Sequence, residues 1–129
     1  MSRKSHVLAT KTFARWMRKS KVNQEDLIIA IQEMADGLID AHLGGHLVKK
    51  RVALQGRGKS AGVRTIIATQ FESRWIYLFG FEKSERSNID RNELKALQEL
   101  AKSYLELSAA EIQAAVKECK LIELNGEVS

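Results

Sequence analysis

Residues 47–53 read LVKKRVA, residues 63–70 read VRTIIATQ and residues 74–81 read RWIYLFGF. These runs are rich in β-branched and aromatic residues, which is typical of β-strands. The last run is apolar on both faces and is therefore predicted to be a central strand. A glycine-rich loop is expected from Gln55 to Gly62 and a polar turn around residues 72–73, so the three strands should form an antiparallel meander.

Amphipathic helices are predicted on both sides of this strand region. Thr10 can cap a helix in which Phe13, Trp16 and Met17 keep helical spacing. Asn23 can cap a second helix whose apolar positions run from Leu27 to Leu38, before Gly44-Gly45 interrupts the pattern.

Two further helices are predicted after the strands. Asp90 with Glu93, and Ser108 with Glu111, form capping boxes ahead of apolar residues at helical spacing. The order of elements predicts an α+β fold, with a small antiparallel sheet and the N-terminal and C-terminal helices packed on one face. The opposite face would then be free to bind a partner.

The composition indicates one globular domain. The 129 residues are 44% hydrophobic and contain no proline, and no linker or repeat interrupts them. We expect a single domain over 1–129, with a C-terminal helical extension at about 108–129. No apolar run is long enough for a membrane span or a signal peptide, and the single cysteine, Cys119, agrees with a reducing compartment, so a cytoplasmic location is expected.

The positive charge is concentrated in the first two thirds of the chain. Residues 1–88 hold 16 lysines and arginines against 8 aspartates and glutamates, whereas residues 89–129 hold 5 against 8. A basic region of this kind attracts nucleic acid by neutralising its phosphates, although many basic proteins bind none.

Cations are densest along the first predicted strand and the loop after it. Alternation places Lys49 and Arg51 on one face of the strand and Lys50 on the core-directed side. The other members of this cluster are Arg57, Lys59 and Arg64. It would suit a polyphosphate backbone, but a strand edge kept charged against aggregation is an equally good interpretation.

Two other motifs are weaker. Residues 53–60, ALQGRGKS, match a loose phosphate-loop pattern, yet the residues that follow predict a strand instead of the required helix. His42 and His46 flank Gly44-Gly45 with no acidic or cysteine partner nearby, so we interpret them as loop histidines.

Three segments resemble one protein family. They are GGHLVKKRVA at 44–53, GRGKSAGVRTII at 56–67 and FEKSERSNI at 81–89. Together they are similar to the RelE/HigB toxins of type II toxin–antitoxin systems, and the similarity extends to KLIE at 120–123. The resemblance implies a microbial-ribonuclease-like fold and metal-independent cleavage of messenger RNA, usually on the ribosome. It also implies a cognate antitoxin, often a helix-turn-helix protein, with no metal or organic cofactor and no membrane partner.

The family's site residues can be transferred by position. They correspond to Lys49 and Arg51 on the first strand, Arg64 at the start of the second, and Lys83 and Arg86 after the last. We predict these five as catalytic and Lys50, Arg57 and Lys59 as RNA-binding. Lysine and arginine can orient a phosphate and stabilise the charge that develops when the RNA 2′-hydroxyl attacks it.

The chain departs from the family pattern after the last strand. Some members have a second arginine and a tyrosine where this sequence has Ser84 and Asp90, and Asp90 is explained as a helix cap. Either Lys49 or Lys83 is then the candidate general base. The alternative function is a non-catalytic basic binding protein or a gyrase-directed toxin of the same superfamily.

Overall fold

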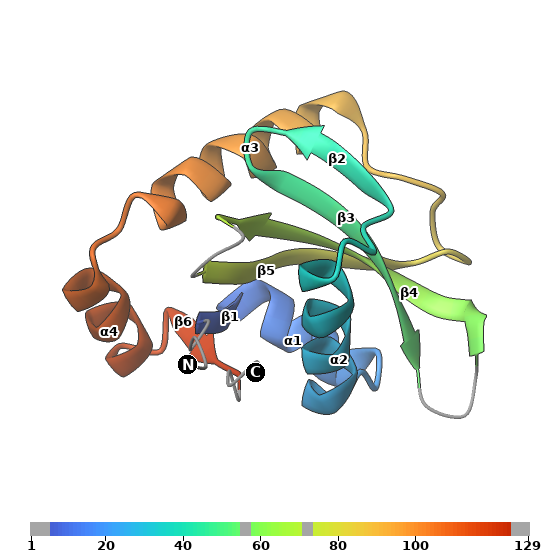
Figure 1. The fold of residues 1–129 in the computed structure, drawn as a ribbon, viewed down its shortest axis with the longest axis horizontal. Coiled ribbons are helices and arrows are strands. Elements are labelled where there is room, and N and C mark those ends of the chain that lie inside the picture. Colours follow the sequence, from blue (N-terminus) through green and yellow to red (C-terminus); the bar gives the residue numbers. More distant parts are fainter. Residues whose placement is uncertain (1–5, 55–57, 71–73, 125–129) are drawn as a thin grey trace.

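The computed structural model describes residues 6–54, 58–70 and 74–124, with backbone only for residues 58–61. The strands are β1 (His6–Thr10), β2 (Ala41–Gly44), β3 (Leu47–Leu54), β4 (Gly58–Thr69), β5 (Arg74–Glu82) and β6 (Leu121–Glu123). The helices are α1 (Lys11–Lys19), α2 (Gln24–Ala35), α3 (Arg91–Leu105) and α4 (Ala109–Lys117). The predicted α+β class is confirmed (Figure 1).

One six-stranded sheet has the order β2-β3-β4-β5-β1-β6. The predicted meander is confirmed, because β3 pairs with β4 and β4 with β5 in antiparallel fashion. Strand β1 lies parallel to β5, and β6 covers the other edge of β1 in antiparallel orientation. Strands β1, β2 and β6 were not predicted, because each has five residues or fewer and carries too little pattern to be recognised.

All four predicted N-cap residues directly precede their helices, Asn23 that of α2 among them. The Phe13 amide donates to Thr10 Oγ1 (3.1 Å) at the start of α1. Both predicted capping boxes are present, with the Glu93 amide donating to Asp90 Oδ1 (2.8 Å) and the Glu111 amide donating to Ser108 Oγ (3.1 Å). These side chains satisfy amide groups that have no partner inside the helix, and so they determine where α1, α3 and α4 begin.

Three predicted boundaries are wrong. The helical extension expected at about 108–129 ends at Lys117, and Leu121–Glu123 form strand β6 of the sheet. Helix α2 ends at Ala35 because Gly37 adopts a φ of 97°, and Leu38 is consequently 58% exposed instead of lying on the buried face. The segment Gly58–Gly62, predicted as loop, belongs to β4. Since Lys59 and Ser60 are extended, the helix required by a phosphate loop is absent there, as the sequence predicted.

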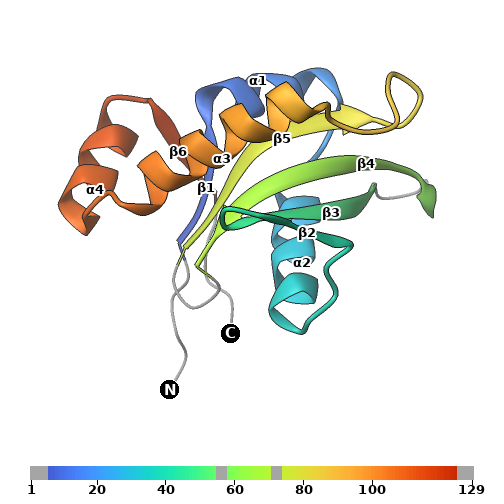
Figure 2. The same cartoon turned by 90° about the horizontal axis from the view of Figure 1, so that it is seen from above.

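Helices cover both faces of the sheet, so the prediction that all of them pack on one face is wrong. Trp75 and Tyr77 of β5 pack with α1 and α2, whereas Ile76 and Leu78 pack with α3 and α4. Figure 2 shows α2 and α3 on opposite sides of β4. The physical reason is that a strand with apolar residues on both faces needs cover on both.

Helix α1 lies so close to β5 that only a glycine fits at position 80. A Cβ on Gly80 would lie 2.3–2.6 Å from three ring carbons of Trp16. Contacts this short force the indole ring or the helix to move.

We expect Gly80→Ala to lower the free energy of unfolding by about 1–3 kcal/mol, because overpacking must be relieved by distortion. Urea denaturation would measure the loss. In a Trp16→Leu background the same substitution should cost clearly less, and an equal cost in both backgrounds would contradict the proposed clash.

Candidate nucleic-acid interface

Three of the predicted cations lie together on the face of the sheet that carries α3. Arg51 of β3 is the register partner of Arg64 of β4, and Lys49 is the partner of Ile66. Ile66 belongs to the apolar cluster beneath α3, whereas Val48 and Val52 point to the other side and pack with α2. The alternation predicted for β3 is therefore confirmed.

These cations lie beyond the apolar contact between α3 and the sheet. Along β3 and β4 the cross-strand pairs on this face are Leu47 with Ala68, then Lys49 with Ile66, then Arg51 with Arg64. Leu47 and Ala68 are buried with α3. The end of β3 and the beginning of β4 extend past α3 (Figure 1). Part of this sheet face is thus basic and uncovered by a helix.

The two arginines have buried donor atoms without partners. Nε of Arg51 and Nη1 of Arg64 are inaccessible to solvent and make no hydrogen bond within the described part of the chain. Like charges directly across a strand pair are destabilising, and a buried donor without a partner costs about 1–3 kcal/mol. An anion between the two side chains would relieve both costs.

A pair of phenylalanines borders this arginine pair on β5. Phe81 is the register partner of Arg64, and Phe79 is the partner of Ile66. Their rings are 6.1 Å apart, and the Arg86 guanidinium lies 5.8 Å and 5.9 Å from the two ring centroids. Since Phe81 is almost fully buried, this pair supports the guanidinium and is poorly placed to stack with a base.

Arg86 also has fixed polar partners. Its Nη1 donates to Glu93 Oε2 (2.8 Å), its Nη2 donates to Glu93 Oε1, and its Nε donates to the Asn88 carbonyl (3.1 Å). The hydrogen bonds from Arg86 and then from the Asp90 amide hold the pKa of Glu93 below its ordinary value. In return, the hydrogen bond to Glu93 raises the pKa of Arg86.

The remaining predicted residues are placed differently. Lys83 is exposed in the turn directly after β5. Lys50 is buried under α2, where its ammonium donates to the Leu38 carbonyl (2.8 Å) and pairs with Glu33 (3.0 Å). This position gives no support to the predicted RNA contact of Lys50. Arg57 and the side chain of Lys59 lie outside the described residues.

A family match spans nearly the same residues as the sheet and its helices. A model described as the RelE toxin of the RelE/RelB toxin–antitoxin system matches residues 5–124. The chain belongs to the RelE toxin family. It is thus the toxin partner of a toxin–antitoxin pair, and a cognate antitoxin is implied. No curated protein matches it significantly.

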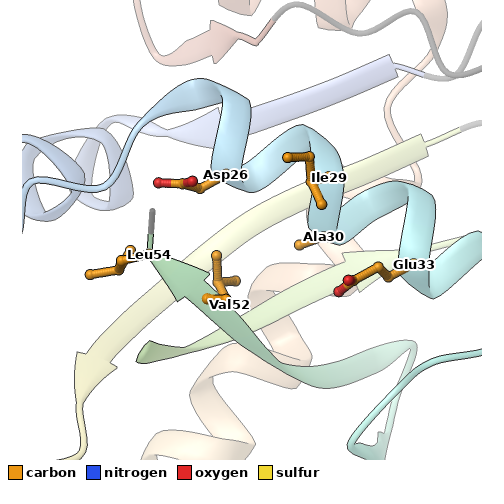
Figure 3. A pocket seen from close by; sticks show the side chains of 7 residues that line it. Asp26, Ile29, Ala30, Glu33, Val52 and Leu54 are labelled. Carbon is orange, nitrogen blue, oxygen red and sulfur yellow. The ribbon is translucent and has the colours of Figure 1, made fainter. Parts of the chain in front are cut away.

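A cavity lies on the other side of β3. This cavity of about 180 Å³ lies between α2 and the end of β3 (Figure 3), where Ile29, Ala30 and Val52 form apolar walls and Asp26 and Glu33 supply carboxylates. Two carboxylates in its wall, one of them already paired with Lys50, make this cavity poorly suited to a phosphate backbone. None of the helices in the described ranges is long and apolar enough to cross a membrane.

Two residues that shape the basic face of this RelE-family toxin were missed from sequence. The capping box accounts for Glu93 in the sequence, and no local pattern indicates that its carboxylate also pairs with Arg86. Asp40 precedes β2, and its Oδ2 accepts the backbone amide of Arg51. Such a contact depends on how β2 meets β3, which was not predictable because β2 itself was not recognised.

We expect Arg64→Met to raise the free energy of unfolding of the toxin by about 1 kcal/mol, because it removes a like charge opposite Arg51 and an unpaired buried donor. Arg74→Met is the matched control, since Nη1 of Arg74 donates to the carbonyls of Tyr104 (3.0 Å) and Leu107 (2.8 Å). The control should be destabilised by about 1–3 kcal/mol.

Urea denaturation with and without sodium sulfate would check this. Sulfate should stabilise the wild type more than Arg64→Met, because bound anion favours the folded state. Destabilisation of Arg64→Met, or equal sulfate effects on both proteins, would contradict the anion site.

Proposed function

We propose that the toxin is a metal-independent endoribonuclease that cleaves messenger RNA, acts on the translating ribosome and so inhibits translation. The single observation that carries this proposal is that two buried nitrogens on this sheet face, Arg51 Nε and Arg64 Nη1, have no hydrogen-bond partner among the described residues. Membership of a family whose toxins are generally ribonucleases supports it. In this proposal the protein acts in the cytoplasm and is neutralised by a helix-turn-helix antitoxin.

The reaction we propose is a transesterification within the RNA. The 2′-hydroxyl oxygen forms a bond to the adjacent phosphorus while the bond from phosphorus to the 5′-oxygen of the next nucleotide breaks. The 2′-hydroxyl proton passes to a general base, and the leaving oxygen takes up a proton from a general acid. The products are a 2′,3′-cyclic phosphate and a 5′-hydroxyl end, so no water or oxidant is consumed.

Each cation has a role in this scheme that matches its position. Arg51 and Arg64 bind the two non-bridging phosphate oxygens and stabilise the charge that develops on them. The general base is either Lys49, two residues before Arg51 on the same face of β3, or Lys83, which is exposed after β5. Arg86 supplies a third guanidinium beside Phe81, which neighbours Arg64.

Expression of the wild type without its antitoxin should arrest translation and cut transcripts within translated codons. Arg64→Ala and Lys83→Ala should each reduce cleavage about 100-fold or more, because removing a transition-state contact costs that much. Lys95→Ala, an exposed lysine of α3, is the matched control and should cleave normally.

Primer extension on induced cells, together with amino-acid incorporation, measures both effects. Growth arrest with intact transcripts would instead favour a gyrase-directed toxin or a non-catalytic binding protein. Folded Arg64→Ala and Lys83→Ala variants that cleave at the wild-type rate would contradict the assigned site.

Neighbouring lysines on opposite faces of β3 give a separate prediction. Lys49→Met should weaken RNA binding and reduce its salt dependence, because one phosphate contact is lost, with little change in stability. Lys50→Met should lower the free energy of unfolding by about 3 kcal/mol, because Glu33 and the Leu38 carbonyl lose their shared partner.

Filter binding at several salt concentrations and urea denaturation would separate the two variants. If Lys50→Met kept its stability and lost RNA binding, the structural role of Lys50 would be contradicted.

A further inference from the structure

A carboxylate lies against the Arg86 guanidinium, next to the basic sheet face. Glu93 is in the first turn of α3, 31% exposed, and pairs with Arg86. On a surface that binds phosphate, such a charge weakens binding by repulsion, so its presence there calls for a compensating function.

Glu93 is itself held from the α3 side. Its Oε1 accepts the Asp90 amide (2.9 Å) while its own amide donates to Asp90 Oδ1 (2.8 Å). The carboxylate is therefore anchored to the beginning of a 15-residue helix that packs on the sheet through Leu97, Ala101 and Leu105. A group attached in this way has a defined position relative to β4 and β5.

Arg86 is fixed from three directions before any RNA binds. Glu93 takes two of its five N–H groups, the Asn88 carbonyl takes a third, and Phe79 and Phe81 lie under the guanidinium. Two N–H groups remain available to a phosphate. Without Glu93, the segment after β5 would keep only the contacts to Asn88 and the rings to orient this side chain.

We propose that Glu93 is a positioning residue, which holds the Arg86 guanidinium next to Arg64 so that both can contact the phosphate undergoing cleavage. This inference rests on the proposed ribonuclease function and adds a residue that does not touch RNA. The gain is preorganisation: Arg86 needs no reorientation when charge develops on the phosphate. The cost is a weaker overall attraction for RNA.

The two effects together predict that Glu93→Gln lowers kcat without raising KM. Glutamine preserves the capping box but cannot hold Arg86 by two charge-assisted hydrogen bonds. We expect kcat for RNA cleavage to fall roughly 10- to 100-fold, since misplacing a catalytic group by about 1 Å costs about 100-fold. KM should stay equal or decrease, because a negative charge has been removed from the RNA-binding face.

Two controls make the assignment specific. Glu99→Gln removes the same charge from an exposed position on α3 and should leave kcat unchanged. In an Arg86→Ala background, Glu93→Gln should cause no further loss, because Glu93 acts only through Arg86. A kcat equal to that of the wild type, or equal losses with and without Arg86, would overturn the proposal.

A spectroscopic measurement on the full chain separates this inference from the ribonuclease function. The Nε–H of Arg86, assigned by its loss in Arg86→Ala, should exchange slowly with solvent in the wild type and at least tenfold faster in Glu93→Gln. If the wild type cleaves no RNA, the function fails while this comparison still decides whether Glu93 orders Arg86. Unchanged exchange would overturn the positioning role whatever the activity.

Discussion

The arrangement of this protein depends on burying both faces of β5. Trp75 and Tyr77 project to one side and Ile76 and Leu78 to the other, and all four are almost completely buried. Burial of large side chains such as these is the main favourable contribution to folding, at about 25 cal/mol per Å² of apolar area. Helices α1 and α2 must therefore cover one face, and α3 and α4 the other. The Tyr77 hydroxyl is accommodated in this core by donating to the Leu27 carbonyl (2.8 Å), and its burial raises the pKa of Tyr77 well above the ordinary value.

The same requirement determines where the basic face can exist. Each helix covers only the length of sheet that its apolar side chains reach, and the apolar cluster beneath α3 includes Leu47, Ala68 and Ile66 but not Lys49. The arginine pair lies two residues farther along the two strands, and within the described part of the chain Arg51 Nε and Arg64 Nη1 find no hydrogen-bond partner. This face carries a cost in stability that a well-packed apolar face would not have. Functional sites commonly contain residues that lower the stability of the fold.

Much of this could be predicted from the sequence, and the failures have identifiable causes. The long strands, the three capped helix starts and the shared face of Lys49 and Arg51 follow from local patterns that tertiary packing did not override. The one-face arrangement of helices was wrong, because a strand that is apolar on both faces, as β5 is, needs helices on both. Lys50 shows a different limit: alternation predicted its side of the strand, but not that Glu33 and Leu38 would hold its ammonium there. The pairing of Arg86 with Glu93 joins two segments through side-chain geometry, which no local pattern reports.

The position of β1 has a consequence for the order in which the chain acquires its structure. Strand β1 is enclosed between β5 and β6, and the Leu124 amide donates to the Val7 carbonyl (2.9 Å), so segments near opposite ends of the described chain complete the sheet. Contacts between residues so distant in sequence form slowly, whereas the neighbouring strands β3 and β4 pair through local contacts. The β3–β4 hairpin, which carries the arginine pair, can thus assemble early during biosynthesis. The sheet becomes complete only after residues 121–124 have been made. A chain halted before that point would present the unpaired edge of β1, a template for association with other chains, and would be exposed to aggregation or proteolysis.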